Sequence, residues 1–461
     1  MTRVKPAVGW AAAAPRQRRW PARRPSDDNR AMNNTPLPLV SWTDDDGQAH
    51  QAPWRSLAGH PAPKRLAVVD DSLNADTAYK WACEGTGLLW VGDFQNARLL
   101  LQALTRRLDG SVQRRAAPRR TSAAKLAKAA APARGKAAAA LRTPEASVFN
   151  VRPLEQVSEL AAAAATGPQA MTQAFLAQRK AQAHRARVLN MLVLPFDADH
   201  SVPLRRAPDV REAGLQAHGP VDSHYVAPLR ELLGLVGAHE WRKKGVEIPA
   251  LKGRIHPHHA VFSPVRGEYV DLVAKAPLPA AAKPARAADV GTGTGVLAAV
   301  LAKRGLKVVA TDTSAAALAC AQDNLARLKL DSSVTLQQQD LFPKGHWGLV
   351  VCNPPWVPAT PHGPLEAAVY DPDSRMLRGY LAGLKAHLAP GGEGWLILSD
   401  LAEHLGLRSR EQLLGWISEG GLKVLGRLDT PPQHKKAADA SDPLHAARAA
   451  ELTSLWRLGV A

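Results

Sequence analysis

Three aspartates stand where a ligand could be held, each at the end of a short apolar run. Asp289 lies in the stretch AADVGTGTG, Asp312 ends KVVATD, and Asp340 ends VTLQQQD. A single aspartate in such a place often caps a helix. Three of them beside a glycine loop predict a site for a nucleoside with a neutral or positive charge, because carboxylates accept hydrogen bonds from ribose hydroxyls and amino groups.

The glycine loop, Gly291-Thr-Gly-Thr-Gly295, could also belong to a dinucleotide site. Its third glycine follows the second by two residues, whereas a dinucleotide fingerprint needs three. Asp289 would also have no task beside a pyrophosphate, whereas its charge suits a ligand that carries an ammonium group. A nicotinamide-dependent oxidoreductase is therefore the weaker alternative.

The stretch GLVVCNPPW, residues 348–356, predicts a second kind of chemistry. Pro354 and Pro355 lack an N–H and have a fixed φ, so they hold a rigid extended turn with outward carbonyls. The Asn353 side-chain oxygen and the Pro354 carbonyl are two acceptors, which match the two donors of a planar amino group. Trp356 offers a face for stacking. These four residues are the predicted catalytic residues, and a rigid loop in a noncatalytic scaffold is the alternative.

The elements that must position these residues begin near Ala285. Apolar runs of strand length alternate with helical patterns as far as residue 400, and two further strands, around 423–430 and 453–460, predict a terminal antiparallel pair. Such alternation is typical of a doubly wound, mostly parallel α/β sheet. Ligands bind at the carboxyl ends of its strands. All the residues named above would meet at that edge.

From about Ala285 to the C-terminus, and more weakly back to Arg254, the chain resembles the class I S-adenosylmethionine-dependent methyltransferases. The resemblance implies a Rossmann-like sheet of seven strands. It implies that Asp289 and the glycine loop hold the methionine part of S-adenosylmethionine, Asp312 the ribose and Asp340 the adenine. The cofactor-binding residues expected from this are Asp289, Gly291, Thr292, Gly293, Gly295, Asp312, Asp340 and Asn353.

The NPPW stretch resembles the Asn-Pro-Pro-aromatic motif of amino-group methyltransferases, with tryptophan where tyrosine or phenylalanine is usual. That set includes adenine-N6 DNA enzymes, guanine-N2 and adenine-N6 rRNA enzymes, and release-factor glutamine enzymes. We expect a base amino group in RNA, ribosomal RNA above all, as the first candidate substrate. A glutamine amide in a protein such as a release factor is the alternative, favoured by the stretch VYDPDSRMLRGYLAGLKAHLAPGG.

Composition divides the 461 residues into five segments. We expect a disordered basic extension over 1–35, an α/β region over 36–110, an Ala-rich basic linker over 111–168, a continuation over 169–253 and the methyltransferase domain over 254–461. Together the two N-terminal regions would form a smaller α+β domain, with a helix over 171–187 and another over 223–245. True initiation at Met32 is an alternative to Met1.

The net charge of +18 lies mainly in two stretches, with +6 in residues 1–30 and +8 in residues 111–145. This concentration is weak support for a folded nucleic-acid surface, although residues 111–145 could form an electrostatic arm. The three cysteines are far apart, which suggests a reducing cytoplasm. The run HPHH, residues 256–259, lacks a completing ligand, so no metal site is expected.

Overall fold

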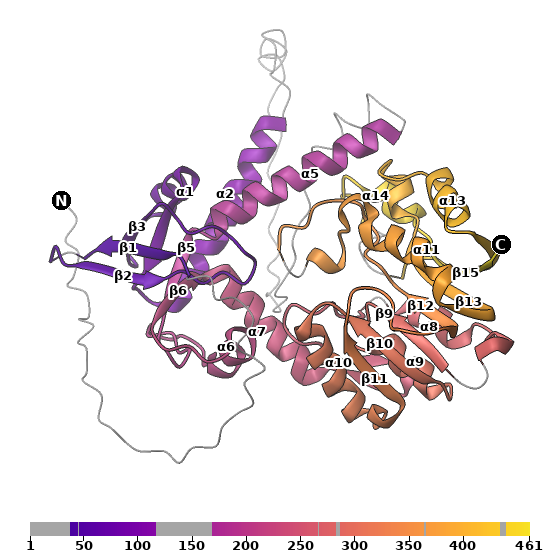
Figure 1. Cartoon of the computed structure of the whole chain (residues 1–461). Helices are drawn as coiled ribbons and strands as arrows, with labels where there is room; N and C mark the ends of the chain where they lie inside the picture. The colour runs from indigo at the N-terminus through magenta and orange to yellow at the C-terminus, as the bar shows by residue number, and fades with distance from the viewer. Residues whose placement is uncertain are drawn as a thin grey trace, which may run out of the picture.

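The computed structural model describes residues 37–44, 46–116, 168–265, 267–282, 286–363, 366–433 and 439–461. The predicted extension over 1–35 and nearly all of the predicted linker lie outside the described residues. Two units lie side by side in Figure 1, an N-terminal unit from indigo to magenta and a C-terminal unit from orange to yellow. A long helix, α5, runs from the first toward the second.

The N-terminal unit is built on a four-stranded sheet in the order β3-β4-β5-β6. The first three strands are parallel and β6 is antiparallel to β5. Helices connect the parallel strands, so the unit is α/β and the predicted α+β class is wrong. Its strands are β3 (Arg65–Val69), β4 (Thr86–Trp90), β5 (Leu192–Phe196) and β6 (Tyr225–Pro228), and its helices are α1 (Ala75–Glu84), α2 (Phe94–Ala116), α5 (Pro168–Leu189), α6 (Arg211–His218) and α7 (Leu229–Lys244).

Both faces of this small sheet are covered, as parallel strands require. Helices α1, α2, α5 and α7 supply one apolar cluster, and the hairpin of β1 (Leu39–Thr43) and β2 (Ala49–Pro53) supplies the other. The helix over 171–187 is confirmed by α5. The helix predicted over 223–245 is only partly correct, because Tyr225–Pro228 pairs with β5 as a strand. The linker predicted from 111 is also shortened, since α2 continues to Ala116.

The C-terminal unit contains a sheet in the order β11-β10-β9-β12-β13-β15-β14. Strands β11 to β13 in this order are parallel, and β15 is antiparallel to both of its neighbours. The predicted α/β sheet with a terminal antiparallel pair is therefore confirmed. Its strands are β9 (Arg286–Val290), β10 (Lys307–Asp312), β11 (Val334–Gln338), β12 (Trp347–Cys352), β13 (Leu388–Ser399), β14 (Leu422–Thr430) and β15 (Thr453–Val460).

Helices cover both faces of this sheet. One apolar cluster joins the sheet to α8, α9 and α10, and another joins it to α11 and α13. A hairpin of β7 (Val246–Ile248) and β8 (Gly253–Ile255) packs against the first cluster. The helices are α8 (Glu268–Lys275), α9 (Val296–Lys303), α10 (Ala315–Arg327), α11 (Arg375–His387), α12 (Leu401–His404), α13 (Arg410–Glu419) and α14 (His445–Ala450). Among the described residues, no helix is long and apolar enough to cross a membrane.

Candidate active site

A cavity of about 760 Å³ opens at the carboxyl ends of β9, β10 and β12. Parallel strands present their carboxyl ends at one edge, so loops far apart in sequence meet there. The cavity wall contains nine of the eleven residues that the sequence singled out, namely Gly291, Thr292, Gly293, Asp312, Asp340, Asn353, Pro354, Pro355 and Trp356. Asp289 and Gly295 are not part of this wall.

The glycine loop forms the floor of one end of the cavity, which we call the cofactor end. Gly291 has φ of 73°, and a Cβ there would lie 2.5 Å from the Met376 Cε atom. Its N–H and that of Thr292 both donate to the Thr311 carbonyl, at 2.9 Å each. Gly295 instead faces α10, where a Cβ would lie 3.0 Å from that of Ala321. Gly295 therefore allows close helix packing rather than ligand contact.

Asp289 lies behind the glycine loop and is almost fully buried. Its Oδ2 atom accepts hydrogen bonds from Thr292 Oγ1 at 2.7 Å and from the Ala298 N–H at 3.0 Å. It thus ties the loop to α9, and its side chain is not part of the cavity wall. Burial raises the pKa of its carboxyl to about 6, although the two hydrogen bonds oppose the shift. Its Oδ1 atom is buried without a hydrogen-bond partner.

The other two acids lie at the cavity wall. Asp312 is half-buried at the end of β10, and its oxygens accept from the Gly293 N–H at 3.0 Å and the Ser314 N–H at 2.9 Å. Asp340 is more exposed and forms an ion pair of 2.9 Å with Arg375, the first residue of α11. Sequence reasoning missed Arg375, because only the packing of α11 brings it to the end of β11.

Asn353 follows β12 directly and faces the cavity together with the two prolines. Its Oδ1 atom accepts a hydrogen bond of 2.8 Å from the indole N–H of Trp356. The Trp356 ring in turn meets the edge of Tyr269, with centroids 6.5 Å apart. An amide oxygen has two lone pairs, so one remains for a ligand. The indole N–H therefore fixes the orientation of the Asn353 side-chain oxygen. This is a second role for Trp356, beside the stacking face that the sequence predicts.

Beyond Trp356 the cavity continues into a mainly apolar part, which we call the acceptor end. Its walls come from elements that are distant in sequence, and none of its residues was predicted. Phe175 comes from α5 of the N-terminal unit. The remaining described residues of this end are Val357, Ala367, Ala368, Val369, Tyr370, Leu401, Leu405, Leu444 and Arg448.

Residues 252–403 match the family model of the methyltransferase small domain. This stretch includes the glycine loop, all three strand-end acids and the NPPW stretch. The C-terminal unit is a class I S-adenosylmethionine-dependent methyltransferase domain. The match covers β9 to β13 and stops before α13, β14, α14 and β15, to which the resemblance in the sequence also extended.

Relatives of this methyltransferase domain include release factor glutamine methyltransferases. The protein of that name from Xylella fastidiosa is 35% identical over 134 residues, which are 24% of this chain and 46% of the relative. That from Moorella thermoacetica is 37% identical over 150 residues, 28% of this chain and 53% of the relative. The chain thus spans about half the length of these relatives. A solved ribosomal protein L11 methylase from Lactobacillus delbrueckii subsp. bulgaricus is 21% identical, with a TM-score of 0.29 over 42% of this chain and 78% of its own.

Asp371 explains how the methyltransferase domain aims α11 at the cavity. Asp371 is buried and directly follows Tyr370, which lines the acceptor end. Its carboxylate accepts hydrogen bonds from the backbone N–H groups of Met376 at 3.0 Å and Leu377 at 3.2 Å. A carboxylate at a helix N-terminus satisfies donors that have no partner within the helix. Burial raises the pKa of Asp371, with these hydrogen bonds opposing the shift. The Asp371 carboxylate therefore caps the first turn of α11 and fixes the positions of Arg375 and Met376.

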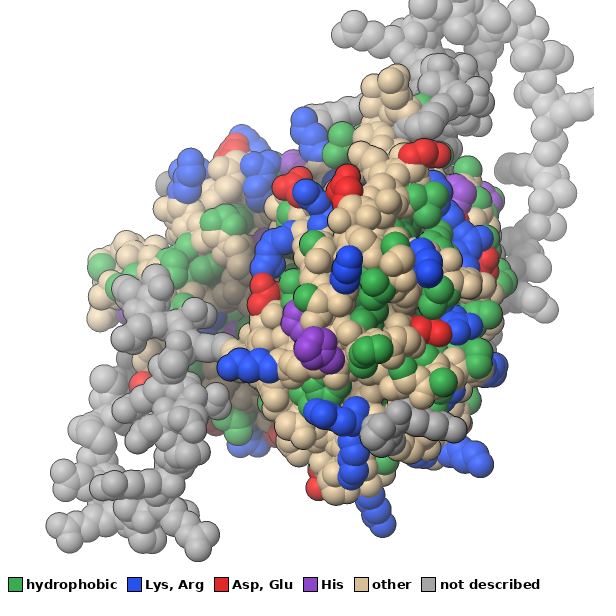
Figure 2. Space-filling view, turned by 45° about the vertical axis from the view of Figure 1, so that its right-hand side comes forward, with side chains coloured by type: hydrophobic (Ala, Val, Ile, Leu, Met, Phe, Trp, Pro, Cys, Tyr) green, Lys and Arg blue, Asp and Glu red, His purple; other side chains and the backbone are tan. Residues whose placement is uncertain are grey.

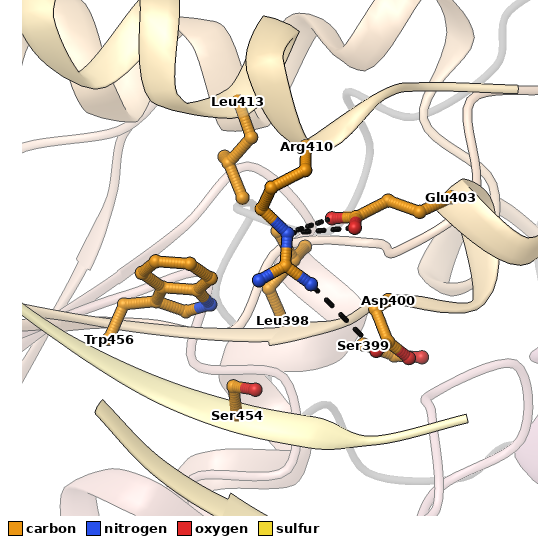
Figure 3. Close-up of a pocket in the computed structure, with 8 residues that line it drawn as sticks. All are labelled: Leu398, Ser399, Asp400, Glu403, Arg410, Leu413, Ser454 and Trp456. Atoms are coloured by element: carbon orange, nitrogen blue, oxygen red, sulfur yellow. Dashed lines mark hydrogen bonds and ion pairs between the residues drawn. The ribbon is translucent and has the colours of Figure 1, made fainter. Parts of the chain in front are cut away.

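A second hollow of the methyltransferase domain shares no lining residue with this cavity (Figure 3). Arg410 fills it: Nε donates to both oxygens of Glu403, and the guanidinium lies 3.8 Å from Asp400 and 5.2 Å from the centre of the Trp456 ring. The hollow has no space for a water molecule. We infer that these side chains pack together at the end of β13 and stabilise the fold there, rather than binding a ligand.

The histidines of the HPHH run are used within the fold. His256 Nδ1 lies 2.7 Å from the Arg242 carbonyl, and His258 Nε2 lies 3.2 Å from Asp323. Across the part of the chain that the structure describes, no three His, Cys, Asp or Glu residues form a cluster suited to a metal ion.

Proposed function

We propose that this protein transfers a methyl group from S-adenosylmethionine to the side-chain amide nitrogen of a glutamine in a protein, such as a release factor. The observation that carries the proposal is the single cavity that joins the glycine loop and Asp312 to Asn353 and Pro354. The relatives named for glutamine methylation favour this substrate over a base in RNA, which was the first expectation from the sequence.

The residues at the cofactor end fit S-adenosylmethionine. Gly293 has no side chain and no atom lies within 4 Å of the place of a Cβ, so a ligand can approach its backbone, whereas the Met376 side chain occupies that place at Gly291. Asp312 would hold the ribose hydroxyls and Asp340 the adenine amino group. Bound there, the cofactor supplies an electrophilic methyl group on a sulfonium.

Asn353 and Pro354 would bind and orient the acceptor amide. The two N–H donors of the amide would bond to the free lone pair of Asn353 Oδ1 and to the Pro354 carbonyl. Both acceptors draw electron density toward nitrogen, and they are held in place before the reaction. Asn353 and Pro354 would thereby hold the nitrogen toward the methyl group that the cofactor would supply; the nitrogen would gain that group, sulfur would keep the electrons of its former bond to carbon, and one amide proton would be released to solvent.

The acceptor end favours an amino-acid side chain over a nucleotide. Phe175, Leu401, Leu405 and Leu444 are apolar, and the aliphatic stem of glutamine would lose no hydrogen bonds against them. A ribose phosphate there would lose its hydration against these side chains, and the arginine of this end, Arg448, is already paired with Asp442 at 2.9 Å. On the face shown in Figure 2, the Lys and Arg side chains of the described residues lie among acidic, apolar and uncharged ones and do not gather into one basic stripe.

The test uses S-adenosylmethionine with a labelled methyl group and extract from cells that lack this protein. The extract is separated into protein and RNA, and each fraction is digested to monomers with enzymes, which leave side-chain amides intact, and analysed by mass spectrometry. We expect the label in N5-methylglutamine from the protein fraction, at a rate lower by roughly a hundredfold or more when Asn353→Ala replaces the wild type. Label found only in RNA bases would overturn the glutamine assignment.

A further inference from the structure

Helix α5 belongs to both units of the molecule. Its carboxyl-terminal end lies in the N-terminal core, where Val188 and Leu189 are buried and Arg185 pairs with Asp109. Its amino-terminal half reaches the methyltransferase domain (Figure 1). There Phe175 is 5% exposed and packs in one cluster with residues from α12 and α14. Thr172 Oγ1 also donates to the Leu405 carbonyl at 2.8 Å.

The acceptor loop, residues 357–363 and 366–370, starts directly after the NPPW stretch. It closes on itself, because the Val357 N–H donates to Val369 O at 3.2 Å and the Asp371 N–H donates to Val357 O at 2.9 Å. Val369 and Tyr370 line the acceptor end of the cavity. The position of this loop therefore sets the width of the acceptor end.

Arg179 of α5 holds the acceptor loop at three points. Its side chain is only 10% exposed. The guanidinium donates to Glu366 Oε2 at 2.9 Å and to the Thr360 carbonyl at 2.6 Å, and it lies 4.1 Å from the centre of the Tyr370 ring. A planar guanidinium suits this arrangement, because it can form hydrogen bonds in its plane while it stacks on an aromatic ring.

A second segment of the N-terminal unit contacts the same loop. Gly363 lies so close to Ala58 that a Cβ would be 2.7 Å from the Ala58 carbonyl oxygen. The N-terminal unit thus contacts the loop through α5 and through the segment after β2. Neither contact involves a residue of the cofactor end.

We propose that the N-terminal unit determines which acceptor enters the cavity, with Phe175 as a specificity wall and Arg179 as a positioning residue for the acceptor loop. This inference rests on the proposed function and deepens it. The NPPW stretch can grip a planar amino group of many molecules. Phe175 and the ring of Tyr370 add a wall that accepts the aliphatic stem of an amino-acid side chain.

The first test compares Arg179→Met with Arg187→Met, an exposed arginine on the same helix. We expect Arg179→Met to raise at least tenfold the amount of extract protein needed for half-maximal methylation, with S-adenosylmethionine affinity within twofold of wild type. Arg179→Lys should restore acceptor affinity only in part, because lysine keeps the positive charge but lacks the planar group with several N–H donors. Equal behaviour of the two methionine variants would overturn the proposal, and so would an equal loss of cofactor affinity.

A second measurement needs no acceptor. Amide hydrogen exchange of residues 357–363 and 366–370 should speed up about tenfold or more in Arg179→Met and stay unchanged in Arg187→Met. If the wild type transfers no methyl group to any fraction, the proposed function fails, whereas this measurement still tests the hold on the loop. Unchanged exchange in Arg179→Met would overturn the positioning role by itself.

The wall itself is tested by Phe175→Ala beside Leu176→Ala, its exposed neighbour on α5. We expect Phe175→Ala to weaken apparent acceptor affinity about tenfold and to allow label into protein residues that the wild type ignores. Leu176→Ala should match the wild type. An unchanged product profile and affinity in Phe175→Ala would show that this side chain does not select the acceptor.

Discussion

The two ends of the cavity are built in different ways. The cofactor end comes from short loops at the ends of neighbouring strands within one unit, and its contacts are largely backbone hydrogen bonds. The acceptor end comes from α5, the acceptor loop, α12 and the segment around α14, and its contacts are side-chain packing across two units. Under the proposals above, neighbouring loops of one sheet hold the cofactor, whereas residues from distant parts of the chain select the acceptor.

The largest expected effect comes at the boundary between the two ends. Asn353→Ala removes an acceptor that counts most in the transition state, so turnover should fall roughly a hundredfold or more. Cofactor affinity measured by calorimetry should stay near the wild-type value. Asn353→Asp should be less damaging because a carboxylate still accepts. Full activity in Asn353→Ala would reduce the NPPW stretch to a rigid loop.

A pH effect is expected for Asp289 at the cofactor end. The pKa of Asp289 is raised to about 6 by burial, so its neutral form stabilises the fold at low pH, and this contribution is lost as the pH rises through about 6. Asp289→Asn stays neutral, and two pKa units correspond to at most roughly 3 kcal/mol.

The melting temperature of Asp289→Asn relative to wild type should therefore increase between pH 4 and pH 7. Acceptor-end variants such as Phe175→Ala should show the same pH profile as the wild type. A difference between Asp289→Asn and wild type that does not change with pH would contradict the role of burial.

Asp312→Ala should weaken S-adenosylmethionine binding by about 1–3 kcal/mol, or up to about a hundredfold. Two causes combine, since the variant loses the acceptor for ribose and frees the Gly293 N–H to which Asp312 is bonded. Asp340→Ala should weaken binding less, because the Asp340 carboxylate, proposed to hold the adenine amino group, is exposed and already paired with Arg375. Equal losses of S-adenosylmethionine affinity in both variants, measured by calorimetry, would contradict the proposal that Asp312 contributes more to cofactor binding than Asp340.

The contrast between the two ends also explains what the sequence could predict. Strand-end acids and a glycine loop are read from spacing, because parallel strands bring their ends to one edge. Spacing assigns Gly295 and Asp289 to the same loop but does not say that both pack behind it, outside the cavity wall. No pattern in the nearby sequence predicts the roles of Phe175 and Arg179, because their partners lie more than 180 residues away in the chain.

The smallest expected effect tests the link between Trp356 and Asn353. Trp356→Phe keeps an aromatic face and loses the 2.8 Å hydrogen bond that directs the Asn353 oxygen. Such a bond contributes about 0.5–1.5 kcal/mol, so kcat should fall roughly threefold to tenfold, with little change in apparent acceptor affinity. Trp356→Ala also loses the stacking face, worth roughly 1–3 kcal/mol for a base but less for a glutamine amide. A large loss of acceptor affinity in Trp356→Ala would therefore point back to a nucleic-acid substrate. A faster Trp356→Phe enzyme would show instead that the indole competes with the acceptor for Asn353.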